Sequence, residues 1–187
     1  MALHDLPRKR LTYEDYVLFP DDGNRHEIID GEHYVTAAPF VRHQRIVVRL
    51  TVSLGRFLEQ HPLGELLVAP TDILLSPHDI VQPDLFFISN ERSAITKDAN
   101  IQGAPDLVIE ILSDSTRRRD ETLKRDRYER FGVLEYWIVD PQRRTVRVFR
   151  RSGPGFLAAQ EFSAVAGDLL ATPLFVGLAV QVSEIFE

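Results

Sequence analysis

The sequence predicts an α/β or α+β fold, in which a mixed β-sheet is flanked by helices and extended by an N-terminal hairpin. Apolar residues recur at three- and four-residue spacing between residues 41 and 58, as they do on the buried face of a helix. Short apolar runs at 80–89 and 104–113 have the length and composition of strands. A further helical segment follows, and another pair of strands comes after it. Helices and strands therefore share one core.

The first predicted elements are a short helix and a hairpin. In LTYEDYVLFP, Thr12 stands three residues before Asp15, which is the spacing of a capping box, and Pro20 ends the helix. In RHEIIDGEHYVT, an Asp-Gly pair at Asp30 separates two apolar-rich arms, and this is a strong signal for a two-residue hairpin turn. The amphipathic helix at 41–58 comes next.

Strands make up most of the chain after that helix. A second helix begins at Ser115 or Thr116, either of which can cap it, and ends at Gly132 in the usual position after a helix. A polar loop occupies 90–103. The strands are expected at 65–76, where Pro70 interrupts the run, at 80–89, at 104–113, on both sides of the Pro-containing turn in 135–151, and near 156–162.

The length of 187 residues and the absence of a linker favour one domain over residues 1–187. The N-terminal stretch MALHDLPRKRLTYEDY has no apolar core, so we expect no signal peptide. The most apolar tract, 164–180, is interrupted by Asp168 and Pro173 and is too broken to span a membrane. The chain has no cysteine, which excludes disulfides and thiolate metal sites and is consistent with a reducing cytoplasm.

The net charge of −6 is not typical of a nucleic-acid-binding protein. Only three of the 22 basic residues are Lys, and Arg is concentrated in the segments 42–49, 117–127 and 143–151. Such local basic patches can contact phosphates on an otherwise acidic protein. They can equally be solvated faces of helices and hairpins, and the composition leaves both interpretations open.

Two predicted strands carry acids among apolar residues. In PDLVIEILS, the neighbours of Glu110 on both faces of the strand are apolar, so the strand is expected to be covered on both faces. An ionised carboxylate in such a place costs several kcal/mol unless it is paired or bound to a cation. The same argument applies to Asp84 in VQPDLFFIS. Because Pro83 and Pro105 suit strand starts, Asp84 should lie near a strand end and Glu110 deeper in the next strand.

Two carboxylates on adjacent strands can converge on one point, where a hard divalent cation is a suitable partner. Mg²⁺ prefers oxygen ligands and keeps several waters, so one or two protein carboxylates and a substrate phosphate can complete its coordination. The residues alone leave an alternative open, in which Asp84 and Glu110 form buried salt bridges with Arg.

The helix that follows Glu110 carries a stripe of polar side chains. Asp120, Lys124 and Tyr128 are spaced four residues apart and share one helix face. Arg is the usual cation of this chain, so a compact ammonium at Lys124 indicates a position that needs a point charge. The alternative is an ordinary surface lysine that pairs with Asp120.

These segments together resemble the Uma-type family of restriction-endonuclease-like proteins, within the PD-(D/E)XK nuclease superfamily. The resemblance covers roughly Tyr13 to Phe186, and no single motif in it is specific. The order of the motifs makes the combination fairly specific. The matching segments are RHEIIDGE, QPDLFFIS, GAPDLVIEILSDST, the D-x-x-x-K-x-x-x-Y pattern from Asp120, GVLEYWIVDP and GLAVQVSEIF.

The resemblance implies a restriction-endonuclease-like fold and metal-dependent cleavage of phosphodiester bonds in DNA. It implies that Asp84 and Glu110 bind Mg²⁺ or Mn²⁺ and that Lys124 is the catalytic lysine. In the common pattern of the superfamily, the lysine lies two residues after the second acid, but Leu112 occupies that position here. The lysine would therefore come from the following helix. The superfamily also often places an acid on its first core helix, and Glu27 of the hairpin can take that role.

Other readings of the same residues remain open. His43 near the start of the 41–58 helix can join the site, although a helix-surface position is the plainer interpretation. Because Leu112 stands where a lysine is usual, the chain can instead be a catalytically inactive member of the fold that serves in binding or assembly. A third reading is an unrelated α/β domain whose acids pair with Arg. By analogy with enzymes that cut both DNA strands, we expect a homodimer.

Overall fold

A computed structural model describes residues 9–187. The first eight residues of the stretch that argues against a signal peptide lie outside the described residues. The centre of the molecule is a seven-stranded sheet in the order β11-β10-β9-β8-β6-β3, with β12 also paired to β10. Its strands are β3 (Gly64–Val68), β6 (Leu85–Ser89), β8 (Leu107–Ile111), β9 (Glu135–Asp140), β10 (Thr145–Ser152), β11 (Gly155–Phe156) and β12 (Gln160–Ser163).

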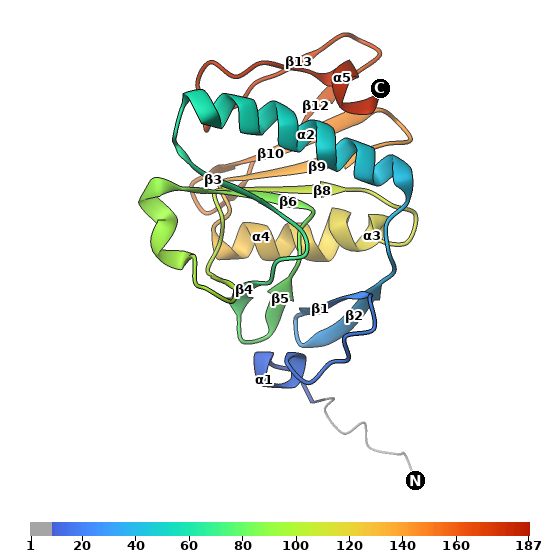
Figure 1. Ribbon diagram of the computed structural model, residues 1–187, viewed down its shortest axis with the longest axis vertical. Coiled ribbons are helices and arrows are strands. Elements are labelled where there is room, and N and C mark those ends of the chain that lie inside the picture. The colour runs from blue at the N-terminus through green and yellow to red at the C-terminus, as the bar shows by residue number, and fades with distance from the viewer. Residues whose placement is uncertain (1–8) are drawn as a thin grey trace.

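Helices cover both faces of this sheet (Figure 1). The long helix α2 (Val41–Gln60) lies on one face. On the other face a continuous helical segment runs through α3 (Arg117–Arg119), the π-helical turn η2 (Asp120–Lys124) and α4 (Arg125–Phe131). It ends at Gly132, whose φ of 92° is left-handed, as the sequence predicts.

Strand β8 is buried on both faces because both layers of helices pack against it. It pairs in parallel with β9 and antiparallel with β6, so the sheet is mixed, as predicted. Its odd-numbered residues, such as Ile109, share a core with Leu50 of α2. Its even-numbered apolar residues, such as Val108, share the opposite core with Tyr128 of α4. Glu110 therefore emerges on the α4 side of the sheet.

A second sheet, in the order β2-β1-β5-β4-β7, contains the predicted hairpin. Asp30 and Gly31 both have positive φ, 55° and 80°, which a two-residue type I′ turn requires. The hairpin joins this sheet through the pair Ile28 and Ile80, so it is part of the packed structure. The strands are β1 (Arg25–Ile29), β2 (Glu32–Thr36), β4 (Ile73–Ser76), β5 (Asp79–Val81) and β7 (Ile101–Gln102).

The structure divides two runs that the sequence suggested as single strands. The run 65–76 forms β3 in one sheet and β4 in the other, with Pro70 between them. The run 80–89 likewise forms β5 and β6, separated at Pro83. Proline has no N–H to donate to a sheet, so the chain passes from one sheet to the other at both prolines. The expected polar loop contains the 3₁₀ helix η1 (Asn90–Ile95) and strand β7.

The two ends of the described chain form small elements at opposite ends of the molecule (Figure 1). At one end, α1 (Tyr13–Tyr16) begins with the predicted capping box, in which the Thr12 amide donates to Asp15. At the other end, β13 (Leu169–Leu170), β14 (Val180–Gln181) and α5 (Val182–Phe186) complete the core on the α2 side. Among residues 9–187, no helix has both the length and the apolar character needed to cross a membrane.

Candidate active site

Asp84 and Glu110 lie on neighbouring strands of the central sheet. Leu85 pairs with Ile109, so extending this antiparallel register by one residue sets Asp84 opposite Glu110. Both side chains are buried, with 3% and 2% of their surface exposed. Both also line a cavity of about 620 Å³ between the hairpin, the start of α2 and the η2 turn. The two acids that the sequence singles out therefore share one cavity.

Three donors hold the Asp84 carboxylate. Arg25 Nη1 lies 2.9 Å from Oδ1, while His43 Nε2 at 3.0 Å and the Ile111 amide at 2.8 Å contact Oδ2. Burial alone would raise the pKa of Asp84. The hydrogen bond and charge of His43, together with Arg25 and the Ile111 amide, outweigh burial and lower the pKa to about 2. Asp84 is therefore a fixed anion at neutral pH.

Glu110 has fewer partners than Asp84. Lys124 Nζ lies 2.5 Å from its Oε1, and the Tyr128 hydroxyl donates to the same atom at 2.8 Å. Within residues 9–187, the other oxygen, Oε2, has neither a hydrogen bond nor an ion pair. Burial raises the pKa of Glu110, and the charges of Asp84 and Glu27 raise it further, although Lys124 acts in the opposite direction.

Lys124 connects the helical layer to the hairpin. Its ammonium also lies 2.8 Å from Oε1 of Glu27, so it bridges two carboxylates, and only 1% of the residue is exposed. The interpretation of Lys124 as a surface lysine paired with Asp120 is therefore wrong. Burial would lower the pKa of Lys124, but the charges of Glu110 and Glu27 raise it above the ordinary value. Lys124 stays charged.

Glu27 enters the cavity from β1, two residues after Arg25 and on the same face of the strand. Besides Lys124, its carboxylate accepts the Gln82 amide at 2.9 Å and lies 3.4 Å from Arg119 Nη2. Burial raises the pKa of Glu27, but Lys124 and Arg119 lower it below the ordinary value. The predicted site residue Glu27 is thus in contact with Lys124.

Leu112 lies two residues after Glu110, at the position where the resemblance drawn from the sequence implies that a lysine is usual. Its side chain is on the Glu110 side of β8, is 4% exposed, and lines the same cavity. Lys124 reaches Glu110 from the opposite direction, out of η2. The ammonium therefore lies beside the second acid even though it is supplied by a helix.

Sequence reasoning gave no site role to Arg25, Arg119 or Asp120, and it left His43 open between the site and the helix surface. The side chain of His43 is only 11% exposed and contacts Asp84. Asp120 is 3% exposed; burial, and next the charge of Glu110, raise its pKa well above the ordinary value. Arg25 and Arg119 pair with Asp84 and Glu27. The two-residue spacing of Arg25 and Glu27 was an available signal for Arg25, and the four-residue spacing used for Lys124 already placed Asp120 on the same helix face.

The donor set fits a hard divalent cation bound by few protein ligands. Among the described residues, no group of three or more His, Cys, Asp or Glu side chains is placed to hold a metal ion. Mg²⁺, however, is commonly bound by one or two carboxylates, waters and substrate phosphate. Burial is the largest cause of the raised pKa values of Glu110 and Asp120, and the charges of neighbouring carboxylates add to it. A cation beside Asp84 and the free Oε2 of Glu110 would stabilise the ionised carboxylates.

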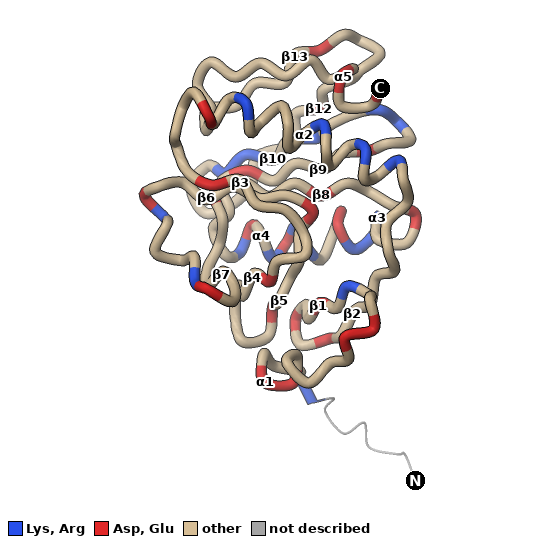
Figure 2. Tube along the Cα trace, viewed as in Figure 1, with Lys and Arg blue, Asp and Glu red and all other residues tan. Residues whose placement is uncertain are grey.

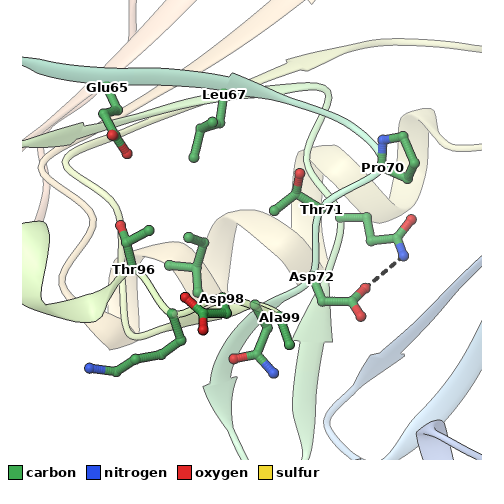
Figure 3. A pocket seen from close by; sticks show the side chains of 12 residues that line it. Glu65, Leu67, Pro70, Thr71, Asp72, Thr96, Asp98 and Ala99 are labelled. Atoms are coloured by element: carbon green, nitrogen blue, oxygen red, sulfur yellow. Dashed lines mark hydrogen bonds between the residues drawn. The ribbon is translucent and has the colours of Figure 1, made fainter.

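A second cavity, of about 480 Å³, is lined by Asp72, Gln82 and neighbouring residues (Figure 3). There the Gln82 amide group donates to Asp72 at 2.7 Å, and the Tyr16 hydroxyl donates to the same oxygen at 2.6 Å. None of the predicted site residues lines this cavity. The residues with candidate chemistry are thus collected in the first cavity.

The family and structure comparisons agree on one group of proteins. The model of the family Uma2, described as "Putative restriction endonuclease", matches residues 13–183. The crystal structure of a protein from Anabaena variabilis ATCC 29413, described as a putative nuclease belonging to DUF820, superposes with a TM-score of 0.79 at 19% sequence identity. The superposition covers 94% of this chain and 97% of that one. The comparison with curated proteins found no match.

Proposed function

This chain belongs to the Uma2 family of putative restriction endonucleases, and on that premise we propose that it is a metal-dependent nuclease that hydrolyses phosphodiester bonds in DNA. The observation that carries the proposal is the pair Asp84 and Glu110, buried opposite each other in one cavity, with Lys124 on Glu110. A family match without this arrangement would support the fold but not the chemistry.

Asp84 and Glu110 would hold the Mg²⁺ or Mn²⁺ ion. When bound, such an ion lowers the pKa of a water and neutralises charge that develops on the phosphate. Four Arg and Lys side chains line the same cavity, and three of them, Arg25, Arg119 and Lys124, are paired with its carboxylates. They would orient the non-bridging phosphate oxygens and stabilise the extra negative charge of the transition state, because they are fixed before the substrate arrives.

Lys124 would act without losing its proton. The two carboxylates beside it keep its pKa above the ordinary value, so it supplies positive charge and does not serve as a base. Glu27 would position the ammonium, since it holds Lys124 from the side opposite Glu110. The reaction needs no covalent intermediate with the enzyme, which agrees with the absence of cysteine from the chain.

A second candidate function is that of a catalytically inactive module that binds nucleic acid. The observation that favours it is the saturation of Asp84 by Arg25, His43 and the Ile111 amide, together with the lack of a third metal-binding side chain among the described residues. In either case, a homodimer would present two sites to a two-stranded substrate. Light scattering after size-exclusion chromatography tests the homodimer directly.

Cleavage of plasmid DNA in Mg²⁺ or Mn²⁺ distinguishes the two functions. The wild type should nick or cut the plasmid, and Asp84→Asn and Glu110→Gln should each abolish cutting while keeping the shape of the side chain. Asp106→Asn is a matched control, because Asp106 also follows a proline and is buried, but it binds the Ser89 amide and Arg92 outside the cavity. A folded wild type that binds but never cuts DNA would support the inactive module.

A further inference from the structure

The reacting groups of the candidate site lie deep in the molecule. Glu27, Asp84, Glu110, Asp120 and Lys124 are each at most 3% exposed. A substrate phosphate must therefore enter the cavity to reach them. At about 620 Å³, the cavity has the size of a small-molecule site. Base pairing holds the backbone of a duplex in place, so a flexible single strand brings one phosphate into a buried cavity more readily than a duplex does.

Phe40 stands at the mouth of this cavity. It lines the cavity, yet 79% of its surface is exposed. No other Phe, Tyr or Trp of residues 9–187 is classed as exposed. The exposed segment Ala37–Ala38–Pro39 leads up to it and forms an apolar wall. Burial of so large an aromatic ring would stabilise the protein, so an exposed ring beside buried acids suggests a partner with a flat apolar face.

We propose that the site prefers an unpaired nucleic-acid strand over a paired duplex, and that Phe40 stacks on one base of this strand while the neighbouring phosphate enters the cavity. This inference rests on the proposed nuclease function, and it names the class of substrate. Proteins that bind single strands combine a positively charged groove with aromatic side chains on which bases stack. Enzymes that modify a base of a duplex inside a pocket first take its nucleotide out of the stack, and an unpaired strand needs no such step.

The charges around Phe40 match a strand that passes over it. Phe40 is the residue before α2, and no side chain caps this end of the helix. The first amides of α2 and the exposed Arg42 therefore add positive potential beside the ring. Figure 2 shows basic residues along α2 and an acidic residue only near its C-terminal end. Arg25 and Arg119 add charge inside the cavity.

Fluorescence anisotropy with labelled oligonucleotides tests the inference without turnover. The probes are a single-stranded DNA, the same sequence as a duplex, and the same sequence as single-stranded RNA, all in EDTA at one salt concentration. We expect either single strand to bind more tightly than the duplex. Phe40→Ala should weaken single-strand binding by roughly 5- to 150-fold, the range for loss of one stacked base. Phe40→Trp should restore it.

Val48→Ala is the control, because Val48 is an exposed apolar residue of α2 that does not line the cavity. It should bind all three probes like the wild type. The inference is overturned if the duplex binds at least as tightly as the single strand, or if Phe40→Ala binds like Val48→Ala. The proposed nuclease function can fail while this inference holds. In that case no DNA is cut in Mg²⁺ or Mn²⁺, but Phe40→Ala still weakens single-strand binding, and the cavity binds strands without cleaving them.

Discussion

Lys124 Nζ lies 2.5 Å from Oε1 of Glu110, although the lysine comes from the helical turn η2 and the acid from strand β8. Helix and strand meet here because Tyr128, one turn after Lys124, also donates to the same oxygen. The lysine is thereby set against the second acid from the helix side. Leu112, two residues after Glu110 and on the same side of the sheet, can remain part of the core.

The role of the Lys124 ammonium can be tested by removing it and then supplying a lysine from another position. Lys124→Met leaves Glu110 buried without its cation and leaves Glu27 with Arg119 alone, which should destabilise the fold by about 3–5 kcal/mol. The same variant should lose cleavage by roughly 10²- to 10³-fold, the cost of one transition-state donor. Urea unfolding and plasmid cleavage measure the two effects.

The double variant Leu112→Lys/Lys124→Met returns a lysine to the same cavity from β8. We expect it to recover part of the cleavage that Lys124→Met loses. Lys124→Arg is the matched control for charge, and its longer, planar group should fit poorly between two carboxylates. If the double variant folds but cuts no better than Lys124→Met, the prediction is contradicted. Cleavage then requires the ammonium at its position on η2, and an ammonium elsewhere near Glu110 does not replace it.

Glu27→Gln tests whether Glu27 positions Lys124. The substitution keeps the shape of the side chain but removes one of the two charges that hold the ammonium. We expect a loss of about 1–3 kcal/mol in the free energy of unfolding, typical of a hydrogen bond to a charged group. Cleavage should fall less than it does in Glu110→Gln, because Lys124 keeps its contact with Glu110. An equal fall in both variants would mean that Glu27 itself contacts the metal or substrate.

Asp140, the last residue of β9, allows a test of how stability depends on pH that does not require metal binding. Burial alone would raise the pKa of Asp140, but Arg117 Nη1, 2.7 Å away, and two backbone amides lower it below the ordinary value. The pKa of Asp140 is lower in the folded state than in the unfolded state, where it is about 4. The ionised carboxylate therefore stabilises the fold above about pH 4, and this stabilisation is lost as the pH falls through the folded-state pKa. We therefore expect about 1–2 kcal/mol of acid-sensitive stability.

Urea unfolding between pH 2 and pH 7 measures this effect. Asp140→Asn removes the titrating group, so its stability should depend less steeply on pH below 4 than that of the wild type. Asp126→Asn is a suitable control, because its carboxylate is mostly exposed. Identical pH profiles for the wild type and Asp140→Asn would contradict the prediction.

Local patterns predicted those parts of the fold that local chemistry determines. The positive φ values at Asp30 and Gly31 and the left-handed Gly132 follow from the residue types alone. The division of 65–76 and 80–89 between two sheets could not be predicted, because an apolar run is equally compatible with either sheet. Pro70 and Pro83 marked the two crossing points but did not identify the sheet on either side of each.

In the candidate site, too, the sequence predicted local properties but not the contacts between distant segments. An acid within an apolar strand predicted that Asp84 and Glu110 would be buried and in need of cations, and both are buried with cations beside them. The identities of those cations depend on contacts between distant segments. Arg25 reaches Asp84 across the fold, and no spacing along the chain encodes that contact. His43 reaches the same acid from α2, so its helix position alone suggested a surface residue.

Metal binding should be detectable as stability, without any turnover. An ion that binds only the native state stabilises it in proportion to the logarithm of its concentration, by about 2.7 kcal/mol at a hundred times the dissociation constant. We expect Mn²⁺ or Mg²⁺ to raise the thermal midpoint of the wild type and EDTA to reverse the rise. Asp84→Asn and Glu110→Gln should abolish the shift, whereas the matched buried acid variant Asp106→Asn should keep it. If the midpoint of Glu110→Gln still rises with Mn²⁺ as it does in the wild type, the ion binds elsewhere, and the free Oε2 of Glu110 does not belong to a metal site.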